Sequence, residues 1–571
     1  MERTWISRYD AGVPTEISYP DCTAPDLIRR SAARAPDSIA LFFYGTRISY
    51  GELDALTTRL AMGLLRLGVR QGDRVALLLP NIPQSVIAYY GVLKTGAVVV
   101  PTNPLYVERE LQMQLLDSGS NIIIALDLLY PRIRAVQAAA ALPKRIIITS
   151  IRDFLPPLKK FLYPFKARLA KRWIARPTGP SIFNFLEVLG MTSDAKDHDL
   201  SDLPRIRADD LAQLQYTGGT TGTPKGVMLT HRNVIASALQ GRAWDPHFHD
   251  GQESFLGAIP FFHSYGQSTC QNLAVATGCR IVLLPRFHPD EVVKAIHKHR
   301  ITVFSGVPMM FAKIADLPHL HRYNLRSLRV CLSGASPLPT DVQDQFERAT
   351  GVRITEGYGL SEAGPTTHCN PLRGERPPGA MGLPFPDTEA RVVDVETGLR
   401  DVPDGEPGEL IVRGPQVMGG YWDKEEETQE VLRNGWLFTG DLVRRNEEGF
   451  FFFVDRKKDI IKSRGETVYP REVEEVLLRH QAVAEAAVVG VADHIYGELV
   501  KAYVVTKPGS FVTEQELIRH CTKWLAHYKI PSAIEFRQEL PRTIIGKVLR
   551  RMMRDEPGRT SETGAVQHQT V

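Results

Sequence analysis

The chain has few cysteines and no long apolar run. Its 6 cysteines, spread over 571 residues, form no CxxC pair and no even spacing, which argues against a disulfide framework and against a zinc site. Apolar runs such as AVVV at 97–100 fall far short of the roughly 18 residues that a membrane-spanning helix needs. The first residues also lack the long apolar core of a signal peptide. We therefore expect a cytoplasmic protein that does not cross a membrane.

A strong excess of charge of one sign is absent too. The 69 Lys and Arg residues nearly balance the 65 Asp and Glu residues, so the net charge is only +4 and any basic surface must be local. We expect no nucleic-acid partner. With 43% hydrophobic and 23% charged residues, the composition is that of a globular protein and excludes disorder, collagen and a coiled coil. At roughly 150 residues per domain, the length allows three or four domain equivalents.

The first two-thirds of the chain alternates between helical and strand patterns. Ser49 and Glu52 have capping-box spacing, and leucines from Leu53 to Leu67 then repeat at helical intervals. Short apolar runs bounded by turn residues follow, as expected of buried parallel strands: 74–80, 97–101, 121–126, 145–149, 280–285 and 301–308, with a helical stretch near 289–300. The pattern predicts an α/β fold with layered subdomains.

After about residue 385 the pattern changes to shorter strands separated by turns. Shorter strands are expected at 390–394, 408–414 and 449–455, which favours an antiparallel β subdomain. A charged segment at 455–459 precedes a helix at about 470–480 and strands near 484–491 and 500–506, so we place a domain boundary there. The predicted divisions are a large domain over 1–455, a connector over 456–461, a small α+β domain over 462–557 and a flexible tail over 558–571.

The segment from Tyr216 to His231, YTGGTTGTPKGVMLTH, is the most informative. Its glycines let backbone N–H groups approach phosphate oxygens closely, its threonines add hydroxyl donors, and Lys225 adds positive charge. A flexible linker would not alternate Gly and Thr and then end in Pro-Lys-Gly. A Walker-type loop requires GxxxxGK followed by Ser or Thr, whereas here Pro224 precedes the lysine and Gly226 follows it. The residues therefore exclude that class.

This segment resembles the signature loop of the adenylate-forming enzymes, which include acyl-CoA synthetases, the adenylation domains of peptide synthetases, and luciferase. The resemblance continues in order through PFFHSYG (260–266), LSGASPL (332–338), TEGYGLSEA (355–363), GELIVRG (408–414), GWLFTGD (435–441), DRKKDIIKSRGE (455–466) and LPRTIIGK (540–547). The stretch at 103–119 is similar to bacterial long-chain fatty acyl-CoA synthetases. The resemblance implies two half-reactions: a carboxylate and ATP give acyl-AMP and pyrophosphate, and coenzyme A then displaces AMP.

The resemblance also implies which residues hold ATP and AMP. Those around the phosphates are Thr217, Gly218, Gly219, Thr220, Thr221, Gly222, Thr223 and Lys225. Those bordering the adenine are Gly334, Ala335, Ser336, Glu356, Gly357, Tyr358, Gly359 and Ser361. Glu362, with help from Thr217, is expected to hold Mg²⁺, and Asp441 with Arg456 to bind the ribose hydroxyls. Many relatives have SGGAPL where this chain has SGASPL.

Lys547 is the expected catalytic residue of the first step. Attack on the α-phosphate builds negative charge on its nonbridging oxygens, which a fixed ammonium stabilises. Lys547 lies more than 300 positions from the phosphate loop, so the two are expected to meet across a domain interface, and the small domain to be mobile. Lys458 matches the family's hinge. For the second step we expect Lys462, also a catalytic residue, to contact coenzyme A with Arg464 and Gly465; a solvated run of charges is the alternative.

The acyl side of the site is less defined. His263 and Tyr265 are expected to line the route between carboxylate and nucleotide, and the histidine to orient the substrate without transferring a proton. Gly306 and Met309 lie where the family builds its pocket wall, although core packing explains them equally well.

Residues 151–176 carry eight Lys or Arg against one Asp, interleaved with large apolar residues at roughly helical spacing. Pro164 predicts two short helical pieces. The segment can rest on an anionic membrane, which would make the protein peripheral to the inner face of the membrane, or it can be a solvated insertion.

The sequence therefore predicts an ATP-dependent, long-chain fatty acid–CoA ligase with ATP and coenzyme A as co-substrates and Mg²⁺ as cofactor. A ligase for aromatic acids, a fatty acyl-AMP ligase and a noncatalytic lipid-binding homologue stay as alternatives. A homodimer is also left open.

Overall fold

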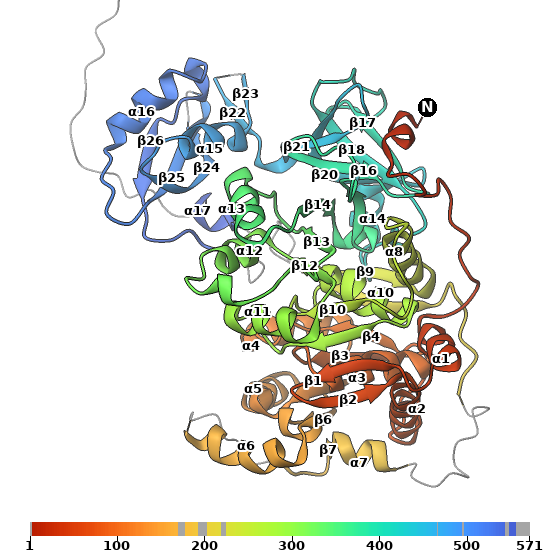
Figure 1. Cartoon of the computed structure of the whole chain (residues 1–571). Coiled ribbons are helices and arrows are strands. Elements are labelled where there is room, and N and C mark those ends of the chain that lie inside the picture. Colours follow the sequence, from red (N-terminus) through yellow and green to blue (C-terminus); the bar gives the residue numbers. More distant parts are fainter. Residues whose placement is uncertain are drawn as a thin grey trace, which may run out of the picture. The chain divides into compact units, whose positions relative to one another are not determined.

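The computed structural model describes residues 3–169, 177–191, 203–217, 224–464, 466–493, 496–542 and 548–554. They divide into two compact units (Figure 1). The large unit comprises Met1–Thr439 and Val443–Phe453, and the small unit comprises Gly440–Leu442 and Val454–Val571.

Helix α2 (Tyr50–Arg66) forms where the capping-box spacing predicts it. The Ser49 hydroxyl accepts a hydrogen bond from the Glu52 amide at 3.2 Å, and the Glu52 carboxylate accepts one from the Ser49 amide at 2.7 Å. Leu53, Leu60 and Leu64 of the leucine stripe are fully buried, and the helix packs on α3 (Pro83–Lys94) and α7 (Phe185–Gly190).

The first sheet of the large unit runs in the order β7-β6-β5-β3-β4-β8-β9 through the described residues. Its strands are β3 (Arg74–Leu78), β4 (Val98–Pro101), β5 (Ile122–Leu126), β6 (Arg145–Thr149), β7 (Ile182–Asn184), β8 (Leu211–Thr217) and β9 (Lys225–Thr230). All pairs are parallel except β8 with β9. The four apolar runs between residues 74 and 149 are therefore buried parallel strands, as predicted.

The second sheet combines a parallel and an antiparallel part. Strands β14-β13-β12-β10-β11-β1 pair in parallel, and β15, β16 and β21 continue from β14 with antiparallel pairing. The strands are β1 (Ile39–Phe43), β2 (Thr46–Ser49), β10 (Ser254–Gly257), β11 (Arg280–Leu283), β12 (Val303–Gly306), β13 (Val330–Ser333), β14 (Ile354–Gly359), β15 (Thr366–Cys369), β16 (Ala380–Pro384), β17 (Glu389–Val393), β18 (Gly408–Arg413), β19 (Leu432–Arg433), β20 (Trp436–Arg445) and β21 (Phe451–Arg456). The predicted antiparallel region thus exists, and it is joined to the parallel sheet through β14.

Helices cover these sheets in the large unit (Figure 1). The remaining ones are α1 (Ala24–Arg34), α4 (Glu108–Ser118), α5 (Tyr130–Ala140), α8 (His231–Ala243), α9 (Ser264–Gly266), a π-helix (Gln267–Asn272), α10 (Leu273–Thr277), α11 (Pro289–His299), α12 (Pro308–Ala315), α13 (Thr340–Thr350) and α14 (Glu425–Val431). Helix α11 confirms the helical stretch predicted near 289–300. No helix within the described ranges is both long and apolar enough to span a bilayer.

Helix α6 (Pro157–Leu169) corrects a prediction, because Pro164 lies inside one continuous helix instead of separating two pieces. A proline at this position removes the amide that would bond to the Lys160 carbonyl four residues earlier. That carbonyl accepts a hydrogen bond from Arg152 Nε at 3.2 Å instead. The side-chain donor compensates for the missing bond and lets the helix continue.

The small unit is an α+β layer structure. Its sheet contains β22 (Ile461–Ser463), β23 (Glu466–Val468), β24 (Val483–Asp493), β25 (Gly497–Thr506) and β26 (Ala533–Phe536), and its helices are α15 (Pro470–Leu478), α16 (Glu514–Thr522) and α17 (Arg550–Arg554). Val488 on β24 belongs to a core cluster with Val473 and Leu517, whereas its neighbour Val489 packs with Met553 of α17. Both faces of β24 are therefore covered. The predicted helix at 470–480 and strands at 484–491 and 500–506 are confirmed.

Candidate active site

The signature loop connects two antiparallel strands. Thr217 at the end of β8 pairs with Lys225 at the start of β9, so the ends of the loop are held together by the sheet. The residues between them, Gly218, Gly219, Thr220, Thr221, Gly222 and Thr223, lie outside the described residues. In a Walker loop a helix follows the lysine, whereas here Lys225 opens a strand. The structure therefore agrees with excluding that class.

Tyr421 joins two of the predicted residues. The Lys225 Nζ atom lies 5.0 Å from the centroid of the Tyr421 ring, and the Tyr421 hydroxyl donates a hydrogen bond to Glu362 Oε1 at 3.0 Å. Burial and the negative charge of Glu362 raise the pKa of Tyr421, so its hydroxyl stays a donor. The cation of the signature loop and the carboxylate predicted for magnesium thus both contact one tyrosine side chain.

The backbone fixes this arrangement. Met228 donates to the Gly420 carbonyl at 2.9 Å, Trp422 to the Gly226 carbonyl at 2.8 Å, and Met418 to the Glu362 carbonyl at 2.8 Å. Residues 418–422 therefore clamp β9 to the turn that carries Glu362. Sequence analysis missed Tyr421, although the Gly-Gly-Tyr-Trp run at 419–422 marks a place where backbone approaches backbone.

Eight of the predicted site residues line one cavity of about 430 Å³ in the large unit. They are His263, Tyr265, Gly334, Ala335, Gly357, Tyr358, Gly359 and Ser361. The cavity lies where β13 and β14 end, and its wall also includes Thr366, His368, Cys369 and Phe385, which sequence analysis did not single out. The pairing of β14 with β15 brings Thr366, His368 and Cys369 to the site, and the pairing of β15 with β16 brings Phe385, which follows β16.

Two positions in this wall show why small residues are needed. A Cβ atom on Gly359 would lie 1.8 Å from the Pro365 carbonyl oxygen, which no side chain tolerates. Ala335 has a φ of 67°, in the left-handed region that favours glycine. Where this chain has SGASPL and many relatives have SGGAPL, an alanine therefore takes a strained conformation.

Glu356 and Ser336 are not part of the cavity lining. The Glu356 Oε1 atom accepts a hydrogen bond from the Leu338 amide at 3.2 Å, and its backbone carbonyl accepts one from the Asn370 amide at 3.0 Å. Glu356 thus holds the loop that follows β13 in place.

Tyr265 anchors the floor of the cavity. Its hydroxyl donates to the Leu332 carbonyl at 2.9 Å, and its ring leaves only 3.1 Å to a Cβ atom placed on Gly334. Ser264 and Ser361 are joined through their hydroxyls at 3.2 Å. His263 Nδ1 accepts a hydrogen bond from the Tyr265 amide at 3.3 Å, which fixes the orientation of its imidazole.

His368 is a fully buried imidazole in the same wall. Its ring lies 5.8 Å from the Tyr358 ring and 4.7 Å from the Phe451 ring, and its Nδ1 atom lies 2.9 Å from the Thr367 hydroxyl. Burial lowers the pKa of His368 to about 3, so the ring is neutral at physiological pH.

A second cavity of about 600 Å³ shares four wall residues with the first: Leu332, Thr366, Cys369 and Phe385. Its other walls come mainly from α8, the π-helix, β12 and β13, and are largely apolar, with Trp244, Phe248 and Leu273 among them. Gly306 and Met309 belong to the lining of neither cavity.

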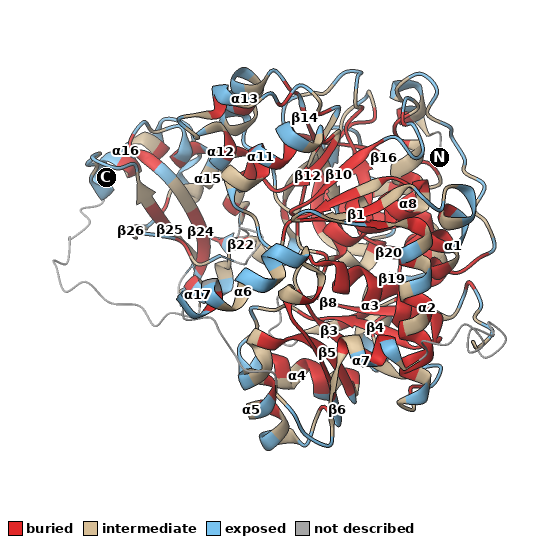
Figure 2. Ribbon diagram, turned by 60° about the horizontal axis from the view of Figure 1, so that its bottom comes forward, coloured by how far each residue is buried: buried red, intermediate tan, exposed pale blue. Residues whose placement is uncertain are grey.

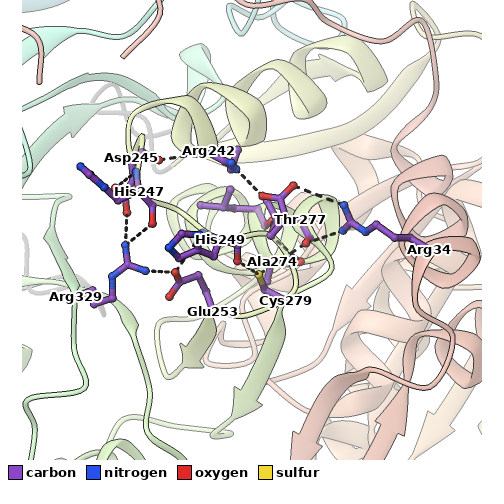
Figure 3. Close-up of polar contacts among 12 residues, drawn as sticks. Arg34, Arg242, Asp245, His247, His249, Glu253, Ala274, Thr277, Cys279 and Arg329 are labelled. Carbon is purple, nitrogen blue, oxygen red and sulfur yellow. Dashed lines mark hydrogen bonds and ion pairs between the residues drawn. The ribbon is translucent and has the colours of Figure 1, made fainter. Parts of the chain in front are cut away.

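One charged group, Asp245, also lines the second cavity. Its carboxylate pairs with Arg373 at 2.9 Å. It also pairs with Arg329 at 3.3 Å, and Arg329 in turn pairs with the buried Glu253 (Figure 3). Because both acids are almost fully buried, these arginines neutralise charge that would otherwise be costly to bury.

The two residues predicted to bind the ribose hydroxyls, Asp441 and Arg456, lie in the small unit. Arg456 Nε is 3.4 Å from Asp441 Oδ1, and Asp441 is buried. Nearby, burial and the positive charge of Arg456 lower the pKa of Lys458, the predicted hinge, to about 8.

Lys462 and Arg464 lie on the hairpin of β22 and β23. Lys462 is exposed, and its Nζ atom donates to the Thr467 hydroxyl at 2.8 Å. Arg464 has a φ of 58° and lies 4.5 Å from the Tyr496 ring centroid. Gly465 and Lys547 lie outside the described residues.

Arg550 was missed by sequence analysis. Its guanidinium bonds Glu474 at 2.7 Å and lies 3.2 Å from both Asp455 and Asp459. It thus ties α17, which follows shortly after Lys547 in the chain, to the charged segment at 455–459. The three carboxylates raise the pKa of Arg550 further, so it is a permanent cation.

Within the described residues, no group of three His, Cys, Asp or Glu side chains gathers as a metal site. Glu362 and Thr217 supply only hard oxygen atoms, which suit Mg²⁺ when substrate phosphates and water complete its coordination.

Two family models match this chain. The model described as AMP-binding enzyme matches residues 28–422, and the model described as AMP-binding enzyme C-terminal domain matches residues 472–547. The chain belongs to the AMP-binding enzyme family. The first match contains the signature loop, both cavities and Tyr421; the second contains α15, β24–β26 and Lys547.

Named relatives cover nearly the whole chain. A long-chain-fatty-acid–CoA ligase of Bacillus subtilis is 45% identical over 97% of this chain and 98% of its own length. A feruloyl-CoA synthase of Amycolatopsis is 35% identical over 91% of this chain and 96% of its own length. Among solved structures, ATP-bound MatB from Rhodopseudomonas palustris matches with a TM-score of 0.81 and 29% identity, covering 93% of this chain and 98% of that one.

Proposed function

We propose that this protein is an ATP-dependent ligase that converts a long-chain fatty acid to acyl-AMP and pyrophosphate, and then to acyl-CoA and AMP. The observation that carries the proposal is the shared wall of the two cavities. The smaller one is lined by the nucleotide motifs, and the larger one is lined mainly by apolar residues, as small-molecule sites usually are. An acid whose carboxylate reaches the nucleotide can therefore extend its chain into apolar surroundings.

The phosphates belong at the β8–β9 hairpin in this proposal. Thr217 and Lys225 close the loop that would surround them, and Glu362 with Thr217 would hold Mg²⁺. The metal would supply charge neutralisation on the phosphate oxygens. Tyr421 contacts both groups, since its ring lies beside the Lys225 ammonium and its hydroxyl donates to Glu362.

The nucleoside has two sets of candidate contacts. In the large unit, Tyr358 contributes an aromatic ring to the lining of the first cavity, between Gly357 and Gly359, and a flat base can stack on such a ring. In the small unit, Asp441 offers a carboxylate for the ribose hydroxyls, and Arg456 orients it. His368, which burial keeps neutral, presents no cation that would hold the fatty carboxylate away from the phosphorus.

Lys547 is proposed to stabilise the charge that develops on the α-phosphate, and Lys458 to be the hinge about which the small unit turns between the two steps. Lys462, Arg464 and Gly465 are proposed to contact coenzyme A in the second step. The exposed hairpin that carries Lys462 is compatible with this role because a large ligand can reach it.

Two alternatives use the same nucleotide chemistry. The feruloyl-CoA synthase relative favours an aromatic acid, and an acyl-AMP ligase would stop before the thioester. The higher identity to the long-chain ligase favours the fatty acid.

A panel of carboxylic acids tests the proposal and the placement of the chain. We expect pyrophosphate release and thioester formation with palmitate and oleate to exceed those with octanoate and coumarate, and both to require Mg²⁺. Gly241, on α8, lines the second cavity, and a Cβ atom there would be in ordinary contact with Leu273 at 3.6 Å. Gly241→Leu should therefore reduce kcat/KM for palmitate by at least about tenfold and spare octanoate.

Gly190→Leu is the matched control, because a Cβ atom on Gly190 meets nothing within 4 Å. Equal losses for palmitate and octanoate in the Gly241 variant would contradict the placement of the chain. Absence of ATP–pyrophosphate exchange with every acid would contradict the proposed function itself.

Contact with an anionic membrane through residues 151–176 and a homodimer both stay predictions. Neither is needed for the two chemical steps.

A further inference from the structure

Helix α6 exposes its apolar residues. Leu158, Phe161, Leu162, Phe165 and Leu169 are 71%, 66%, 41%, 61% and 89% exposed. At about 100° per residue these five positions fall on one stripe along the helix. The rings of Phe161 and Phe165 lie 6.1 Å apart on that stripe. Figure 2 shows the helix as a largely exposed element of the large unit.

The opposite side of α6 faces the protein. Ala167 is buried, and Lys160 and Tyr163 are half-buried. These three positions lie about 180° around the helix from the exposed stripe. The usual amphipathic pattern is therefore reversed, since the side with small and polar residues packs inward and the side with large apolar residues faces outward.

The charged residues of α6 are all basic, since residues 157–169 contain no Asp or Glu. By the same geometry the exposed Lys159 falls on one flank of the stripe and the exposed Arg168 on the other. An exposed apolar stripe on a helix whose only charges are positive is the pattern of a helix that lies in the plane of an anionic membrane surface.

The helix is firmly mounted. Lys159 Nζ donates to the Tyr44 carbonyl at 2.7 Å, the Thr46 hydroxyl donates to the Phe154 carbonyl at 2.7 Å, and Arg152 supports the carbonyl that Pro164 leaves without its usual partner. The start of α6 is thus fixed to the β1–β2 turn. Because the helix is formed before binding, little ordering entropy opposes docking.

We propose that the outward face of α6 docks on a bilayer containing anionic phospholipid, with Phe161 and Phe165 as its central inserted side chains. A second copy of this chain fits less well, because a two-fold contact between two α6 helices would bring basic flank against basic flank. Docking itself does not depend on the proposed function. Only its use does, because a membrane-bound ligase could take up fatty acids from the bilayer into which they partition.

Vesicle flotation tests the proposal without using catalysis. The full chain is mixed with phosphatidylcholine vesicles with and without about one-third phosphatidylglycerol. We expect binding to the anionic vesicles, weakened when salt rises from about 0.1 M to about 0.5 M. The double variant Phe161→Ser, Phe165→Ser should bind at least about tenfold more weakly, whereas Phe511→Ser, which changes a phenylalanine that is 99% exposed in the small unit, should bind normally.

Unchanged binding by the double variant, or no binding of the unaltered chain to anionic vesicles, would overturn the proposal. The proposal would also be overturned if sedimentation showed the unaltered chain to be a dimer and the double variant to be a monomer, since this face would then serve self-association. Octanoate ligation is measured separately and should be equal in all three proteins. If the unaltered chain did not ligate octanoate, this would count against the proposed function and would leave the flotation result valid.

Discussion

At the scale of single residues, a few side chains position the charged groups of the site. The Tyr421 ring contacts the Lys225 ammonium and its hydroxyl donates to Glu362, so one side chain holds both the cation and the carboxylate in place. His368, which burial keeps neutral, adds a polar atom to the wall of the first cavity without adding a charge. A neutral wall neither repels nor traps the fatty carboxylate of the proposed reaction.

The role of Lys547 leads to a first prediction at this scale. Lys547→Ala should lower acyl-AMP formation by about a thousandfold or more, because the ammonium acts on charge that appears only in the transition state. Conversion of supplied acyl-AMP to thioester should be retained. Pyrophosphate exchange and thioester formation are assayed in parallel, with the exposed Lys507→Ala as control. Equal damage to both steps would disprove the separate roles.

At the scale of elements, the signature loop is a hairpin connection and not a strand-to-helix turn. Its ends are fixed by the pairing of Thr217 with Lys225, and the backbone of 418–422 holds β9 from the other side. In the small unit, α17 has a comparable attachment, since Arg550 bonds carboxylates that come from the charged segment and from α15.

This attachment gives a prediction for α17. Arg550→Ala should destabilise the small unit by about 3–5 kcal/mol, because it leaves the buried carboxylates of Asp455 and Glu474 without their cation. Burial already raises the pKa of both groups. With the cation removed, the folded state takes up protons more readily than the unfolded chain, so the variant's stability should fall as pH rises from 5 to 8.

Urea unfolding of the Arg550 variant at several pH values measures this effect. Arg519→Ala, an exposed arginine of α16, is the control and should change little. If the free energy of unfolding fell by less than about 1 kcal/mol at every pH, water and not Arg550 would be stabilising the charges of Asp455 and Glu474.

At the scale of the whole molecule, two buried histidines make the stability of the large unit depend on pH. Burial lowers the pKa of His231 to about 4 and that of His368 to about 3, both below the ordinary value of 6.5. The unfolded chain therefore binds more protons than the folded one between pH 6.5 and 4. Stability from these groups is fully present above pH 6.5 and is lost as pH falls.

The contribution of His368 is measured by comparing the free energy of unfolding at pH 7 and at pH 5, in the unaltered chain and in a His368 variant. Each buried histidine should account for about 2 kcal/mol of the loss between the two values. His368→Asn keeps a polar atom near Thr367 and should reduce the loss by that amount, whereas His321→Asn, at an exposed position, should not. Identical pH profiles for the two variants would mean that His368 becomes protonated in the folded state.

The sequence by itself determined the classes of structure and much of the site. Local rules of capping and apolar periodicity were sufficient for α2, for the buried strands and for the α/β class, because those signals act between neighbouring residues. The motif residues from His263 to Ser361 that line the first cavity were also predicted, since each lies in a short run of recognisable residues. Only the tertiary structure decided the rest. Tyr421, His368 and Arg550 reach their partners through strand pairing and packing over long separations in the chain, and Pro164 remains helical because Arg152 satisfies the carbonyl that it leaves unbonded.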